Sequence, residues 1–175
     1  MRIGKGAAVA TAVVLCSLTA AGPAQAAVGA DSGVYTESDQ CDWLSNNDFV
    51  GASGSADDGD RTVTTYTAKA TDLYAFAAIS GSVERYDKVW IDRSVNPFVM
   101  GSDASHPSDD EVQANGGWKQ CGPYEATWWN AAWDYFESPT VQLQAGGGKS
   151  YAVRACMRPH DSDKSTCAPW FVDHG

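Results

Sequence analysis

A pattern that occurs twice in the chain places the strongest constraint on how it can fold. The first copy runs through 62–92 and the second through 140–171. Each contains a Thr-Val segment, a Tyr-Ala segment and a segment with a Trp, in that order, and a Gln-Cys pair precedes each copy. Self-similarity at a fixed spacing is the signature of an internally repeated architecture. We therefore expect two related halves, 41–93 and 121–172, joined by a connector at 94–120.

Within each copy the side chains alternate between two faces, as they do along β-strands. The segment 62–67 is rich in β-branched residues, and 89–92 places its aliphatic residues on one face and Trp and Asp on the other. A period of two, without a sustained helical period, predicts antiparallel sheet. We expect an all-β fold, an antiparallel β-sandwich of about seven or eight strands that forms a single domain over 41–175.

Two polar stretches are predicted to lie outside the strands. Residues 51–60 are rich in Gly, Ser and Asp and predict a solvated loop. Three aspartates there invite a calcium interpretation, but the ligand spacing and terminal Glu of an EF-hand loop are missing. The connector holds the densest polar cluster in the chain, His106 with Asp103, Asp109, Asp110 and Glu111. A catalytic or metal-binding role is one interpretation of this cluster, and we favour a solvated connector.

The first 26 residues have the three parts of a secretory signal peptide. Arg2 and Lys5 supply the positive charge, 7–18 form the apolar segment, and 24–26 (AQA) match the small-residue cleavage pattern. The apolar segment is shorter than the roughly 20 residues that span a membrane, and no later stretch approaches that length. We therefore expect a secreted protein without membrane insertion, with a flexible lead-in at 27–40 before the folded domain.

Four cysteines follow the signal peptide: Cys41, Cys121, Cys156 and Cys167. An even number in an exported chain indicates disulfide bonds, and four cysteines allow three pairings. We favour Cys156 with Cys167, because they would close the loop 157–166 at the same end of two adjacent strands. Cys41 would then pair with Cys121 and tie together the starts of the two halves. Because no two cysteines are close in sequence, a zinc site is disfavoured, and we expect no metal and no cofactor.

The chain is acidic, which limits the partners it can attract. Its formal net charge is −10, and it becomes −12 once Arg2 and Lys5 leave with the signal peptide. Such a field repels the phosphate backbone of nucleic acids and anionic membrane surfaces, so we expect no nucleic acid partner. Acidity also keeps a secreted protein soluble, which is a simpler reason for the same charge.

The segment 118–136 has the most unusual composition, with four of the seven tryptophans. If helical, it stacks Trp129 on Trp133 at i, i+4, and if extended, it places both on one face with Tyr135. An aromatic row beside Asn and Asp suits a sugar-binding platform, because apolar sugar faces stack on indoles while polar side chains bind the hydroxyls. Alternatively, the rings form the core between the two halves. Solvent exposure distinguishes these interpretations for the candidate ligand-binding residues, Trp128, Trp129, Trp133 and Tyr135.

Two other functions stay open beside binding. The loop 157–166, held at its base by the favoured disulfide, would present a rigid segment as many protease inhibitors do. A small extracellular hydrolase would need an activated nucleophile or two carboxylates about 5–10 Å apart. The segment 51–55 misses the Gly-x-Ser-x-Gly pattern by one position. We assign no catalytic residue and expect a non-catalytic protein that binds a polysaccharide, or a cell-surface or extracellular protein.

Two stretches resemble motifs of a known group of proteins. Residues 87–94 (DKVWIDRS), and 151–156 (YAVRAC) followed by 167–171 (CAPWF), are similar to motifs in small secreted proteins of mycelial, high-GC Gram-positive bacteria. The resemblance covers about a quarter of the mature chain. It implies export and a β-rich fold with a disulfide. It implies no particular activity and assigns no catalytic residue.

Overall fold

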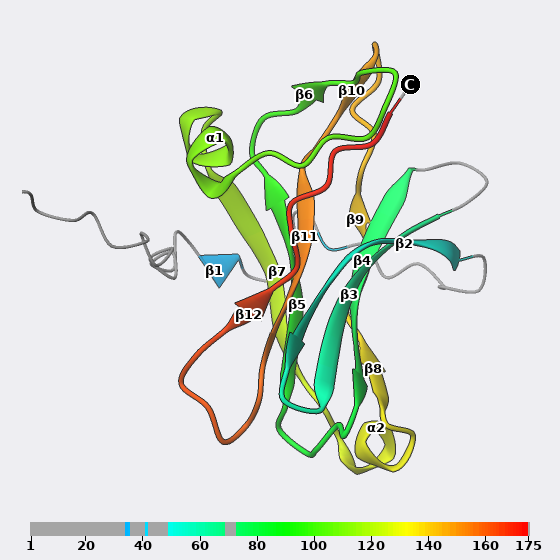
Figure 1. Cartoon of the computed structure of the whole chain (residues 1–175), viewed down its shortest axis with the longest axis vertical. Coiled ribbons are helices and arrows are strands. Elements are labelled where there is room, and N and C mark those ends of the chain that lie inside the picture. Colours follow the sequence, from blue (N-terminus) through cyan, green and yellow to red (C-terminus); the bar gives the residue numbers. More distant parts are fainter. Residues whose placement is uncertain (1–33, 36–40, 42–48, 69–72, 175) are drawn as a thin grey trace, which may run out of the picture.

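The computed structural model describes residues 34–35, 41, 49–68 and 73–174. The predicted signal peptide and most of the predicted lead-in lie outside the described residues. In the described part, two β-sheets pack face to face, accompanied by a two-stranded ribbon and two short helices (Figure 1). The predicted all-β fold, an antiparallel sandwich, is confirmed.

Each sheet of the sandwich has five strands. The first contains, in order across the sheet, β1 (Val34–Tyr35), β7 (Trp118–Glu125), β5 (Lys88–Ser94), β11 (Val153–Arg158) and β12 (Thr166–Cys167). The second contains β2 (Phe49–Asp58), β3 (Arg61–Ala68), β4 (Tyr74–Gly81) and β8 (Tyr135–Glu137), and β9 (Val141–Gln142) also pairs with β4. The ribbon is β6 (Phe98–Val99) with β10 (Lys149–Ser150), and the helices are α1 (Asp109–Ala114) and α2 (Trp128–Ala132). Among the described strands, seven have three or more residues, which agrees with the predicted seven or eight.

The hydrophobic core lies between the two sheets. Its fully buried members alternate along three strands: Ala75, Ala77 and Ile79 in β4, Val89 and Ile91 in β5, and Val153, Ala155 and Met157 in β11. The alternation arises because only one face of each strand meets the opposite sheet. On the outer face, Phe76 stacks on Tyr66 with the ring centroids 5.2 Å apart. Burial of a Val, Ile or Met side chain contributes about 1.5–3 kcal/mol, so these positions stabilise the sandwich.

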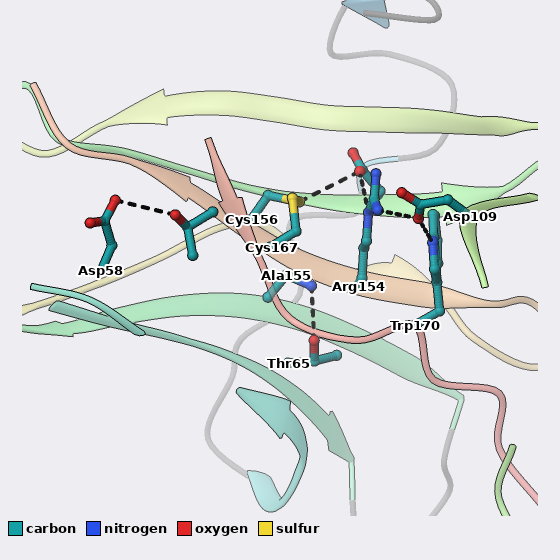
Figure 2. Close-up of a disulfide and its surroundings, with 10 residues drawn as sticks. Asp58, Thr65, Asp109, Arg154, Ala155, Cys156, Cys167 and Trp170 are labelled. Carbon is teal, nitrogen blue, oxygen red and sulfur yellow. Dashed lines mark hydrogen bonds and ion pairs between the residues drawn. A yellow bond between two sulfur atoms is a disulfide. The ribbon is translucent and has the colours of Figure 1, made fainter. Parts of the chain in front are cut away.

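A hydrogen bond between the sheets crosses this core. The carbonyl of Ala155 accepts from the N–H of Ala168 at 2.8 Å, so the N–H of Ala155 points toward the same edge of β11. The strand β12 has already ended there at Cys167. The hydroxyl of Thr65, a fully buried residue of β3, accepts from this N–H at 2.8 Å (Figure 2). The bond satisfies a backbone group that would otherwise be buried without a partner.

The stretch 51–60, expected to be a loop, forms most of β2, and only the turn at Gly59 and Asp60 leaves the strand. The expectation was wrong because pairing with β3 outweighs composition. Small polar residues of β2 meet threonines of β3, with Ser55 Oγ and Thr64 Oγ1 3.0 Å apart. Asp57, one of the three aspartates that invited a calcium interpretation, accepts from Thr62 at 2.7 Å. β2 is an edge strand, where small residues and charges are well tolerated.

The repeated sequence pattern does not extend to strand pairing. In the first copy, β3 and β4 are hydrogen-bonded neighbours in the second sheet. Their counterparts in the second copy, β9 and β11, belong to different sheets. The two related halves are therefore a feature of the sequence without a matching arrangement of strands.

Both favoured disulfides are present. Cys156 and Cys167 are directly opposed on β11 and β12, and Cys41 is bonded to Cys121 across a separation of 80 residues. Closing so long a loop stabilises the fold by roughly 4–5 kcal/mol in the chain-entropy model. The Cys41 bond also holds the preceding chain near β7. Part of the predicted flexible lead-in, residues 34–35, accordingly forms β1 and pairs with β7 in parallel at the margin of the first sheet.

The connector contains the helix α1, which the sequence analysis did not expect. Ser108 caps it: its hydroxyl accepts from the backbone N–H of Glu111, whose carboxylate accepts from the N–H of Ser108 at 2.7 Å. This reciprocal pair is a capping box. The helix buries Val112 in a second small core with Ala152, Trp170 and Val172. Most of the polar cluster noted in the connector is therefore the first turn of a helix.

An ion-pair network fixes α1 on the outer face of the first sheet (Figure 2). Arg154 donates from Nε to Asp92 at 2.9 Å and from Nη1 to Asp109 at 2.5 Å, and the indole N–H of Trp170 also donates to Asp109 at 2.6 Å. The Arg154 guanidinium lies 4.4 Å from the centre of the Trp170 ring and 5.0 Å from that of Trp118. Burial raises the pKa of Asp92 to about 6, although Arg154 acts in the opposite direction.

Replacing Thr65 with Val should destabilise the sandwich by about 1–3 kcal/mol, because the N–H of Ala155 then loses its acceptor without a change in side-chain shape. The free energy of unfolding from urea titration measures this effect. Thr62→Val is the control, since the Thr62 hydroxyl bonds to Asp57 in an exposed pair, and it should change stability by less than about 0.5 kcal/mol. Equal effects of the two substitutions would contradict a special role for the bond between the sheets.

Candidate functional site

The candidate ligand-binding residues lie on the connection between the two sheets. The chain leaves the first sheet at the end of β7, forms α2, and enters the second sheet as β8, where Phe136 pairs with Ile79 of β4. The sequence left strand and helix open for this segment, and it is a helix over Trp128–Ala132. The N–H and hydroxyl of Thr127 both donate to Asn130 Oδ1, at 2.8 and 2.7 Å, which fixes the start of the helix. α2 lies at one end of the molecule, opposite the β6–β10 ribbon (Figure 1).

The four predicted residues are not part of the core. Trp128 is 69% exposed, Trp129 and Trp133 are each 77% exposed, and Tyr135 is 39% exposed. Trp129 and Trp133 are four residues apart at the helix and its C-cap, so they lie on the same side of α2. Tryptophan is highly buried on average in folded proteins, and three exposed indoles on a five-residue helix and its C-cap are unusual. The alternative interpretation, in which these rings fill the core, is therefore wrong.

Two residues that the sequence analysis did not single out complete the site. The guanidinium carbon of Arg85 lies 4.3 Å from the ring centre of Tyr86 and 5.0 Å from that of Trp128. Tyr86 is itself 47% exposed. We call the six residues the aromatic site: Arg85, Tyr86, Trp128, Trp129, Trp133 and Tyr135. No local signal in the sequence links the two segments, because their proximity depends on the pairing of β5 with β7.

Backbone hydrogen bonds join the two segments of the aromatic site. The N–H of Tyr86 donates to the carbonyl of Ala126 at 3.0 Å, and the N–H of Ala126 donates to the carbonyl of Asp87 at 2.8 Å. Tyr86 has φ +75° and Asp134, which follows Trp133, has φ +51°. Left-handed backbone at such residues costs roughly 1–3 kcal/mol each and occurs preferentially at functional sites. Among the described residues, the two non-glycine residues with this conformation thus lie within the segments that carry the exposed rings.

A buried carboxylate holds the loops behind the aromatic site. Asp87 is fully buried, and its Oδ2 accepts from Arg61 Nε at 2.8 Å and from the N–H of Glu84 at 2.7 Å. Its Oδ1 accepts from the N–H of His160 at 2.9 Å and lies 3.2 Å from the ring Nδ1 of the same residue. Asp87 therefore connects the start of β3, the loop between β4 and β5, and the loop between β11 and β12.

The surroundings of Asp87 keep it ionised. Burial by itself would raise the pKa of this carboxyl, but the hydrogen bonds from the N–H groups of Glu84 and His160, from Arg61 and from the His160 ring outweigh burial. The net pKa of Asp87 therefore lies below its ordinary value. Charge-assisted hydrogen bonds of this kind are about twice as strong as neutral ones, which suits a residue that joins three segments.

The loop 157–166, the candidate inhibitor segment, is held at three points. The disulfide between Cys156 and Cys167 closes its base, and His160 is bound to Asp87 within it. The hydroxyl of Thr166 also donates to Asp58 of β2 at 3.2 Å. The loop is thus tied to both sheets, and its inhibitor role stays a prediction.

The structure places His160 beside Asp87, a contact relevant to the hydrolase alternative. In the part of the chain that the structure describes, no serine hydroxyl hydrogen bonds to His160, whose N–H and ring Nδ1 both face Asp87. The buried aspartates Asp87 and Asp92 are each paired with an arginine. These contacts hold segments together, and the hydrolase alternative stays a prediction.

One group of potential metal ligands occurs among the described residues: Asp92, Cys156 and Cys167. The two sulfurs are bonded to each other, so neither can bind a metal as a thiolate. Asp92 Oδ2 contacts the Cys156 sulfur at 3.5 Å and is already paired with Arg154. The chemistry of these residues therefore does not fit a metal ion.

No protein-family model, curated protein or solved structure matches the chain. Across the described residues, no helix is long and apolar enough to cross a membrane.

Replacing Asp87 with Asn should destabilise the protein by up to about 3–5 kcal/mol at pH 7, because the buried Arg61 loses its shortest carboxylate pair and keeps only the longer pairs with Asp60 and Glu84, at 3.5 and 3.7 Å. Since the folded-state pKa of Asp87 is lowered, its stabilisation is complete above its ordinary pKa of about 4 and disappears as the pH falls further. The stability difference between the two proteins should therefore be constant from pH 7 to about pH 5 and shrink below pH 4. Urea titrations across this range measure it.

Asp161→Asn is the control, because Asp161 is an exposed residue of the loop between β11 and β12. It should leave stability within about 0.5 kcal/mol of the original at every pH. A difference between the original protein and Asp87→Asn that grows below pH 4 would contradict the lowered pKa of Asp87.

Proposed function

We propose that this protein is a secreted, non-catalytic binding protein that holds a polysaccharide on its aromatic site. The observation that carries the proposal is the exposure of Trp128, Trp129 and Trp133, between 69% and 77%, on one short helix and its C-cap. Exposed apolar surface of this kind costs a monomeric protein solubility, and it usually marks an interaction site.

The chemistry of the exposed rings suits a sugar polymer. Pyranose rings have faces of C–H groups that pack on the flat surface of an indole, and a row of indoles engages successive sugar units. Polar side chains that can bind hydroxyls lie beside the rings. Asn130 is on α2 itself, and Glu137 accepts from the hydroxyl of Tyr135 at 3.1 Å.

The hydrogen bonds that fix the aromatic site in place also favour binding. Trp129 and Trp133 are carried on a capped helical turn, and the turn is joined to the β4–β5 loop through Ala126. Asp87 in turn fixes that loop to β3 and to the loop after β11. A site that is rigid before the ligand arrives loses less conformational entropy on binding, which increases affinity.

The predicted signal peptide and the two disulfides agree with an extracellular location for this activity. Polysaccharides of cell walls and of the surrounding medium are exposed in that compartment. Among the described residues, the pairing of the buried aspartates Asp87 and Asp92 with arginines favours binding over hydrolysis.

Replacing Trp129 or Trp133 with Ala should weaken binding to the cognate polysaccharide about tenfold, because we expect the stacking of a sugar on an indole to contribute about as much as the stacking of a base, on the order of 1–3 kcal/mol. The stability of the protein should change little, since both rings are 77% exposed. Titration calorimetry against a panel of soluble polysaccharides measures the affinity, and thermal unfolding measures the stability.

Val99→Ala is the matched control, because Val99 is also 77% exposed but lies on β6, at the far end of the molecule (Figure 1). It should leave the affinity unchanged. The proposal fails if no polysaccharide in the panel binds, or if the tryptophan variants bind as tightly as the Val99 control.

A further inference from the structure

The aromatic site contains a cation whose charge is not neutralised by the protein. Arg85 lies against the rings of Tyr86 and Trp128, at 4.3 and 5.0 Å. Within the part of the chain that the structure describes, no carboxylate is within ion-pair distance of Arg85 and no acceptor is hydrogen bonded to it. The donors of this guanidinium are therefore available to a ligand.

Three acidic residues of the neighbouring segments already have partners, whereas Asp134, between Trp133 and Tyr135, has no ion pair among the described residues. Glu84, which precedes Arg85 in the chain, lies 3.7 Å from Arg61 and 3.4 Å from the ring of His160. Glu125, at the end of β7, pairs with Lys88 at 3.2 Å, and Glu137 accepts from Tyr135. In a chain of net charge −10, these nearby acids pair elsewhere while the arginine does not.

The contacts of Arg85 also divide the aromatic residues into two groups. The guanidinium covers part of the Trp128 and Tyr86 rings, so these two rings hold the cation in place. No cation or ring contact is found for Trp129 or Trp133 in the described structure, and both are 77% exposed. The open indoles are thus separate from the pair that orients Arg85.

We propose, on the basis of the function proposed above, that the aromatic site takes an acidic polysaccharide, whose uronic acid carboxylate pairs with Arg85 while neighbouring sugar rings stack on Trp129 and Trp133. Arginine presents a fork of N–H donors that matches a carboxylate in a bidentate pair. Its position against two rings reduces the side-chain freedom that such a pair would otherwise remove. The overall negative charge opposes a polyanion at long range, but exposed charges are screened beyond about 8 Å at physiological salt.

The experiment compares polymers that differ only at C6 of the sugar. The matched pairs are β-1,4-glucan with β-1,4-glucuronan, α-1,4-galactan with α-1,4-galacturonan, and β-1,4-mannan with β-1,4-mannuronan, all as soluble oligomers. Affinities are measured by titration calorimetry at 150 mM NaCl for the mature protein and for Arg85→Gln, Arg85→Lys, Trp129→Ala and Lys149→Gln. The last variant removes an exposed cation from β10, at the opposite end of the molecule, and controls for the change in net charge.

We expect at least one acidic oligomer to bind about tenfold more tightly than its neutral partner. Arg85→Gln should abolish this preference, so that the acidic oligomer binds no more tightly than its neutral partner. Arg85→Lys should restore only part of the preference, because a lysine cannot form the bidentate pair. Trp129→Ala should lower the affinity for both oligomers of the pair, and Lys149→Gln should change neither affinity.

The results distinguish a failure of the acidic ligand from a failure of polysaccharide binding. If Trp129→Ala weakens binding but neutral oligomers bind as well as acidic ones, or if Arg85→Gln keeps the preference, the acidic ligand is wrong and polysaccharide binding stands. If no oligomer of any pair binds, both the acidic ligand and polysaccharide binding are wrong. Thermal unfolding of each variant confirms that the compared proteins are folded.

Discussion

The burial of Asp87 as an ionised carboxylate is the constraint on which the functional end of this molecule depends. Burying a carboxylate costs much free energy unless its charge and lone pairs are satisfied, and here Arg61, two backbone N–H groups and the ring of His160 do so. These partners come from three segments: Arg61 from the start of β3, Glu84 from the loop between β4 and β5, and His160 from the loop between β11 and β12. The same contacts that satisfy the charge therefore hold three segments in one arrangement, and removing Arg61 would leave Asp87 buried without its arginine partner.

The arrangement of these loops explains how a small protein can expose three tryptophans. The carbonyl of Asp87 accepts from Ala126, and the N–H of Tyr86 donates to Ala126, so the position of the β4–β5 loop determines where α2 begins. Exposed indoles on a mobile segment would pack onto any nearby apolar surface, whereas indoles on a capped turn between two sheets stay accessible. The left-handed backbone at Tyr86 and Asp134 costs free energy, which the surrounding packing of the sandwich offsets. The proposed binding of a polysaccharide follows from this combination of rigid support and open rings, and Arg85 adds the selectivity for an acidic sugar.

The sequence predicted what depends on periodicity and on chain connectivity. The alternation around Val89 and Ile91 reports a strand with one buried face, and the even cysteine count with adjacent strands was enough to favour the correct disulfides. The strand at 51–58 was missed because its composition is that of a loop and only the pairing with β3 makes it extended. The helix α1 was also missed, although Ser108 and Glu111 form a capping box with a local sequence signature. The aromatic residues were identified, but their exposure and their contact with Arg85 depend on the register of distant strands, which no local pattern encodes.

Acrylamide quenching of tryptophan fluorescence, with and without polysaccharides, tests both the exposure of the aromatic site and its binding of sugars. Trp90 and Trp170 are buried, whereas Trp128, Trp129 and Trp133 are largely exposed. We expect acrylamide to quench a large part of the emission of the free protein strongly, and a cognate polysaccharide to protect this same part. Weak quenching of the free protein would contradict the exposure of the aromatic site. Strong quenching that no polysaccharide relieves would contradict its role as a sugar-binding platform.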